Sequence, residues 1–160
     1  MKTKVAYFGV FTALALIFSY IESIIPISIG IPGAKLGLAN LIVVITLYKM
    51  GVKEAYLLSV VRVVLAGFIF GNLFGILYSL AGGLLSLTVM AVLKKMDQFS
   101  VIGISMAGGV FHNMGQLIMA GIVVESTGVI YYMPALLIVG LVTGFLIGVM
   151  AREMIKRLQK

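Results

Sequence analysis

A single arginine interrupts one of the apolar stretches of this chain. Arg62 follows Lys53 by nine residues in an otherwise apolar run. In a helix this spacing places it roughly 13 Å along the axis, near the middle of a ~30 Å hydrocarbon core. Its side chain is then too deep to reach water easily. Such an arginine either pairs with buried carbonyl or carboxylate groups or faces a ligand. Because no acidic residue lies at a matching depth in the sequence, we favour a ligand-facing Arg62.

A second polar group lies near the middle of a later apolar run. His112, Asn113 and Gln116 fall within five residues, and Gly108 and Gly109 precede them. His112 and Gln116 are four residues apart, so they share one face of a helix, and the two glycines leave space beside them. A lone histidine is often only packed within a bundle. Three polar groups beside a glycine pair nevertheless favour a binding face.

Three more polar residues lie near the ends of apolar runs. Glu22 closes the first run and could reach inward from its last turn, while Lys35 and Asn40 open the second run. Lys35 is either an interfacial anchor or the top of a pocket, for which the apolar segment 24–33 would be a lid. Asn40 lies about 7.5 Å deeper along a helix. The candidate substrate-binding set is Glu22, Lys35, Asn40, Arg62, His112, Asn113 and Gln116.

Several other kinds of chemistry are not expected from this sequence. It has no cysteine, which excludes disulfides, thiolate metal sites and cysteine nucleophiles. It has one histidine and no carboxylate at ligand spacing from it, so we expect no metal. There is no Ser-His-acid grouping, no Walker-type phosphate loop and no aspartate-rich magnesium motif of the kind that prenyl transfer requires. We therefore expect neither an enzyme nor an ATPase, and no cofactor.

Transmembrane helices are the elements that must position these residues. Of 160 residues, 62% are hydrophobic and 11% charged, more apolar surface than a soluble domain of this size can bury. The net charge of +7 comes from basic residues at alternate gaps between apolar runs. This positive-inside pattern explains the charge without nucleic acid, with anionic lipid as the counter-charge. The predicted helices are 5–23, 34–48, 53–70, 73–93, 99–124 and 131–150.

These features predict an all-α integral membrane protein. We expect one domain (1–160), a compact bundle of six transmembrane helices in a bacterial cytoplasmic membrane. Both termini would lie on the cytoplasmic side, because an even number of spans agrees with the charge pattern.

Three stretches of the sequence resemble one family. They are PGAKLGLANLIVV (32–44), the helix that carries Arg62, and HNMGQL (112–117), with Glu22 ahead of an apolar proline-containing loop. Over essentially the whole chain they resemble the Gx transporter family, whose members are often labelled heptaprenyl diphosphate synthase component I. That family is in turn similar to the substrate-binding S components of energy-coupling-factor transporters. Those are six-helix membrane proteins that bind a vitamin or related molecule near the outer face.

The resemblance implies partners and a transport cycle. An S component works with a membrane coupling subunit and two cytoplasmic ATPases, and it topples within the bilayer during transport. In S components an Ala-x-x-x-Ala row on the first helix contacts the coupling subunit. The nearest match here is Gly9-x-x-x-Ala13, in which glycine replaces the first alanine.

We therefore expect an S component that captures a small organic molecule from outside. Arg62 and Lys35 favour a phosphate- or carboxylate-bearing ligand, whether vitamin-like, flavin-like or isoprenoid-related. The alternative is a membrane-embedded accessory subunit, component I, of a heptaprenyl diphosphate synthase, which would bind a soluble prenyltransferase. A third interpretation is a stand-alone channel or facilitator.

Overall fold

The computed structural model describes residues 2–25 and 36–158. Within these ranges the chain is helical and contains no strand. Four of the helices are long and apolar enough to cross a membrane: α1, α4, α5 and α6, the last together with η1. The elements are α1 (Lys2–Ile24), α2 (Leu38–Lys49), α3 (Val52–Phe70), α4 (Leu73–Lys95), α5 (Val101–Val124), η1 (Thr127–Tyr132) and α6 (Met133–Arg157). The prediction of an all-helical membrane protein is therefore confirmed at this level.

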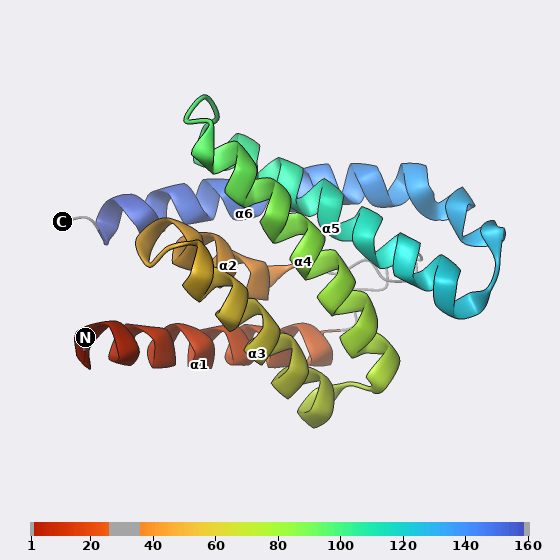
Figure 1. Cartoon of the computed structure of the whole chain (residues 1–160), viewed down its shortest axis with the longest axis horizontal. Helices are drawn as coiled ribbons and strands as arrows, with labels where there is room; N and C mark the ends of the chain where they lie inside the picture. Colours follow the sequence, from red (N-terminus) through yellow and green to blue (C-terminus); the bar gives the residue numbers. More distant parts are fainter. Residues whose placement is uncertain (1, 26–35, 159–160) are drawn as a thin grey trace.

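Successive helices run back and forth along the long axis of the molecule (Figure 1). Both termini lie toward one end, together with the α2–α3 and α4–α5 turns, while the α3–α4 and α5–α6 connections lie toward the other. The closest packing joins α5 to α6 and α4 to α5, and α2 packs against α1, α3 and α6. Every residue from Leu41 to Leu47 is buried, so α2 forms the centre of the bundle.

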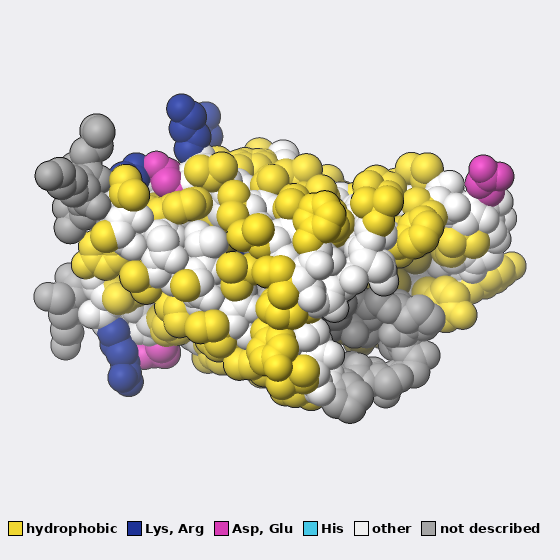
Figure 2. All heavy atoms as spheres, turned by 90° about the horizontal axis from the view of Figure 1, so that it is seen from below, with side chains coloured by type: hydrophobic (Ala, Val, Ile, Leu, Met, Phe, Trp, Pro, Cys, Tyr) yellow, Lys and Arg dark blue, Asp and Glu magenta, His cyan; other side chains and the backbone are white. Residues whose placement is uncertain are grey.

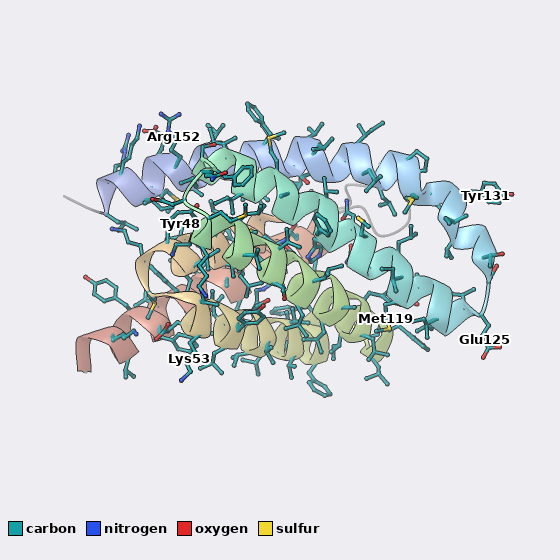
Figure 3. The ribbon with its side chains drawn as sticks, turned by 45° about the horizontal axis from the view of Figure 1, so that its top comes forward. Tyr48, Lys53, Met119, Glu125, Tyr131 and Arg152 are labelled. Atoms are coloured by element: carbon teal, nitrogen blue, oxygen red, sulfur yellow. The ribbon has the colours of Figure 1, made fainter. Side chains whose placement is uncertain are left out.

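Basic side chains are concentrated at one end of the same axis. On the face shown in Figure 2, lysine and arginine side chains gather, with some acidic ones, at the end that carries the termini, and hydrophobic side chains are spread along the surface between the two ends. Tyr48, Lys53 and Arg152 lie at this end, whereas Glu125 and Tyr131 lie at the opposite end (Figure 3). This distribution agrees with the positive-inside pattern of the sequence.

Lys94 joins two helices at the basic end. Its Nζ donates a hydrogen bond to the carbonyl oxygen of Leu47 at 2.6 Å and lies 4.8 Å from the ring centroid of Tyr48. A cation at this position satisfies a carbonyl at the end of α2, and it is stabilised by the negative end of that helix's dipole. The end of α4 is thereby fixed against the end of α2.

Glycines set the spacing between α5 and α6. A Cβ atom on Gly109 would lie 2.2 Å from the carbonyl oxygen of Gly140, and one on Gly144 would lie 2.7 Å from the Cα of Met106. The two backbones therefore touch directly, as small residues permit between helices in lipid. Their position inside the bundle means that these glycines serve internal packing.

The predicted second helix is displaced toward the C-terminus. The sequence predicts a helix over 34–48, but α2 begins at Leu38, because Gly37 adopts a left-handed conformation (φ 74°, ψ 25°) that a right-handed helix cannot include. The sixth helix begins at Met133 after η1 and continues to Arg157. The basic tail is therefore part of that helix.

Candidate functional site

A cavity of about 180 Å³ lies inside the bundle, and all six helices contribute to its wall. Four helices bring six of the seven candidate side chains to it. Lys35 lies outside the described residues. The candidate residues that line the cavity are Glu22, Asn40, Arg62, His112, Asn113 and Gln116.

The sequence of α3 explains why Arg62 points inward. Its buried residues include Ala55, Leu58, Ser59 and Arg62, which follow the pattern i, i+3, i+4, i+7 and so form one helical face. That face packs against the centre of the bundle and carries the arginine with it. Arg62 is only 9% exposed.

Arg62 makes few of the hydrogen bonds available to it. Its Nη2 donates to Oδ1 of Asn40 at 3.1 Å, whereas Nε has no hydrogen-bond partner among the described residues. No carboxylate of the described ranges pairs with it within 4.0 Å. A guanidinium has five N–H donors, and burial without partners is costly. Its unused donor capacity therefore makes it the strongest candidate in the cavity for binding an anion.

Glu22 places a negative charge in the same cavity. It lies in the last turn of α1, where Oε1 accepts a hydrogen bond from the backbone N–H of Gly37 at 2.5 Å. A longer contact of 3.5 Å joins Oε2 to the N–H of Ala39. The carboxylate acts electrostatically on Arg62, although the two groups form no direct ion pair. Glu22 therefore holds the beginning of α2 beside the arginine.

The three polar residues of α5 differ in their surroundings. Asn113 is buried, and its Nδ2 donates to the carbonyl oxygen of Leu136 in α6 at 2.7 Å. His112 and Gln116 are positioned from the other side by α4, since a Cβ on Gly82 would lie 2.6 Å from the backbone oxygen of His112 and 2.8 Å from Cγ of Gln116. Asn113 thus ties α5 to α6, while the glycine of α4 lets the other two residues pack close.

Hydroxyl groups on α1, α4, α5 and α6 also line the cavity, and none of them was predicted from the sequence. Ser79 and Ser86 are seven residues apart in α4, Ser105 precedes the glycine pair of α5, and Thr143 comes from α6. The seven-residue spacing puts both α4 serines on one face, a signal that the sequence already contained. Asn72 also borders the cavity, and its side chain caps α4 by accepting from the N–H of Gly75 at 2.8 Å.

The arrangement suits binding better than metal chemistry. In the described part of the chain, no cluster of three or more histidine, aspartate or glutamate residues could hold a metal ion. The cavity instead offers a cation, a carboxylate, amides, an imidazole and hydroxyls, which together can bind a small polar group by charge and hydrogen bonds.

Gly9 and Ala13 lie away from this cavity on an exposed face of α1. Both residues are exposed, and a Cβ on Gly9 would meet no atom within 4 Å. The described chain leaves this face uncovered. Its role as a partner interface stays a prediction.

Long apolar helices around a compact cavity that several polar side chains line define this chain as a helical membrane protein with an internal candidate site. The chain also matches the family described as heptaprenyl diphosphate synthase component I over residues 11–154. Since the match covers most of the chain, the protein belongs to this family, and the family resemblance of its motifs is confirmed. No curated protein and no solved structure matches the chain. The further similarity to S components stays a prediction.

Proposed function

We propose that this protein is a membrane-embedded binding subunit, not an enzyme, that holds the anionic group of a small molecule in its cavity. The observation that carries the proposal is the environment of Arg62, which is nine-tenths buried, lines the cavity and has a donor without a partner among the described residues. A phosphate or carboxylate would satisfy both its charge and its planar array of donors.

The size of the cavity restricts what can be enclosed. Sites for drug-sized ligands measure about 300–1,000 Å³, and this one measures about 180 Å³. It therefore suits a compact polar group rather than the long chain of a heptaprenyl molecule. Such a chain would have to leave the cavity and lie against the apolar surface of the bundle. A vitamin-like or flavin-like ligand would likewise insert only its smaller polar part.

We propose further that all six helices cross a bacterial cytoplasmic membrane, with both termini on the cytoplasmic side. The alternating helix directions and the basic residues at the end with the termini support this topology. The short α2 has 12 residues, or about 18 Å of helix. Because its neighbours bury it, it can end within the bundle without exposing backbone to lipid.

Two assemblies are compatible with a binding subunit, and the family match favours one. The family description names component I of a heptaprenyl diphosphate synthase, which supports an accessory subunit that presents an isoprenoid-related anion to a soluble prenyltransferase. The second candidate is an S component with a membrane coupling subunit and two ATPases. Six alternating helices, an internal cavity and the uncovered face at Gly9 and Ala13 support it.

Purification in mild detergent from the native host separates the two assemblies. A co-purifying soluble prenyltransferase supports the synthase subunit, whereas a membrane subunit with two ATPases supports the transporter component. Mass spectrometry of the small molecules that co-purify would give the ligand directly. A purified protein that carries neither proteins nor a small molecule, and that conducts solutes in liposomes, would overturn both assemblies.

Arg62→Ala tests the binding site itself. We expect it to weaken binding of the co-purified molecule at least about tenfold, since a buried charge-assisted pair would be lost. Arg152→Ala is the matched control, because it removes the same charge from an exposed residue at the basic end. Equal affinity of Arg62→Ala and the wild type would remove Arg62 from the site.

A further inference from the structure

The beginning of α2 is held by a side chain from another helix. The N-cap residue is Gly37, so α2 has no side-chain cap of its own. The Glu22 carboxylate supplies that function from α1, by accepting hydrogen bonds from the N–H groups of Gly37 and Ala39. The N–H groups at the beginning of a helix attract negative charge. In this structure the negative charge at the beginning of α2 therefore belongs to the protein itself, as the Glu22 carboxylate.

Arg62 lines the same cavity and is an independent indication that an anion binds there. Its guanidinium is held by Asn40, which lies in the first turn of α2. Its Nε has no partner in the described part of the chain although the residue is nine-tenths buried. Glu22 acts on Arg62 electrostatically but is bonded to the backbone of α2 and not to the guanidinium. The cation and the helix amides thus border one cavity, and Glu22 satisfies only the amides.

We propose that Glu22 is an internal substitute for the anionic group of the ligand, and that a phosphate or carboxylate displaces it. The incoming group bonds to Arg62 and to the N–H groups at the beginning of α2, and the Glu22 side chain turns away from them. This inference rests on the proposed function, because it requires an anionic ligand in the cavity. It gives Glu22 the role of a competitor, whereas its position in the sequence predicts a residue that contacts substrate.

Displacement also has a conformational consequence. The hydrogen bonds of Glu22 join the last turn of α1 to the beginning of α2, on the two sides of segment 26–35. An anion that takes over the amides of Gly37 and Ala39 breaks that connection. The last turn of α1 then becomes more mobile when ligand binds.

Titration with inorganic diphosphate tests the competition. We expect Glu22→Gln to bind diphosphate about tenfold more tightly than the wild type, because a like charge beside the site is removed while an acceptor oxygen remains to cap α2. Glu125→Gln is the control, since it removes the same charge at the far end of the bundle (Figure 3) and should bind as the wild type does. Equal or weaker binding by Glu22→Gln would overturn the inference, as would undetectable binding by both proteins.

A spin label on the otherwise wild-type chain tests the displacement without altering Glu22. The sequence contains no cysteine, so a nitroxide on Ile24→Cys reports only from the last residue of α1, where the native side chain is 59% exposed. We expect saturating diphosphate to increase the mobility of this label, and we expect Glu22→Ala, which has no acceptor to cap α2, to show high mobility with or without diphosphate. An unchanged spectrum on addition of diphosphate to the wild-type background would contradict displacement. The proposed function would still stand if Arg62→Ala weakened binding of the co-purified molecule.

Discussion

Replacing Gly109 with alanine should force α5 and α6 apart. The added Cβ would lie 2.2 Å from the carbonyl oxygen of Gly140 and 3.1 Å from its carbon. Both neighbours are backbone atoms, so no rotamer change can relieve the overlap. To reach the ordinary contact distance of 3.4 Å, the helices must separate locally by about 1.2 Å. We therefore expect this single methyl group to disturb a whole stretch of the α5–α6 interface.

The magnitude follows from two opposing terms. Overpacking in a close-packed interior costs about 1–3 kcal/mol, and a gap of 0.5–1 Å removes roughly a quarter to a half of the attraction between facing atoms. Alanine recovers about 0.5–1 kcal/mol, since it is the better helix former. We expect a net loss of about 1–2 kcal/mol, or a factor of roughly 5–30 in the unfolding equilibrium.

Denaturation by sodium dodecyl sulfate in mixed micelles, followed by circular dichroism, measures this change. Gly9→Ala is the matched control, because its Cβ meets nothing within 4 Å and the exposed site should gain about 0.5–1 kcal/mol. If Gly109→Ala were as stable as Gly9→Ala, the inference that the backbones of α5 and α6 touch at Gly109 would be wrong. The close approach would then not be a property of the folded protein.

Two further substitutions test other contacts by the same denaturation assay. Lys94→Met should lower the free energy of unfolding by about 1–2 kcal/mol, because the carbonyl of Leu47 loses its charged donor and the cation–π contact disappears. Lys95→Met, at an exposed neighbour, is the control, and an equal effect of the two substitutions would contradict this. Asn113→Leu should lower the free energy of unfolding by about 0.5–1.5 kcal/mol, in the range of hydrogen bonds between helices in lipid. An unchanged midpoint of denaturation would show that the hydrogen bond to Leu136 contributes nothing to stability.

The sequence predicted the helices well because the features that mark them are local. Apolar length, basic residues between runs and the Gly71–Asn72 break are all visible without tertiary contacts. The beginning of α2 could not be placed in the same way. It depends on Gly37 adopting a left-handed conformation, and a glycine in a sequence does not reveal which sign of φ it will take.

The site was predicted in part for a similar reason. Buried polar residues stand out in apolar runs, so Arg62 and the α5 group were found from the sequence alone. The bond from Glu22 to the amide of Gly37 spans 15 residues and depends on how the chain returns from α1 to α2, which no periodicity encodes. The serines of α4 were overlooked because a single hydroxyl is common in membrane helices, and only their convergence on one cavity gives them meaning.

Glycine has two effects in this bundle. It lets α5 approach α6, which gains contact, and it contributes no side chain to fill the cavity, which Gly67, Gly75, Gly108 and Gly109 all border. Empty space inside a protein forfeits the attraction that neighbouring atoms would supply. A molecule that fills the space restores those contacts and stabilises the folded state by an amount that grows with its concentration relative to its Kd. The ligand should therefore stabilise the bundle around the cavity, where Arg62 and the beginning of α2 would hold its anionic group.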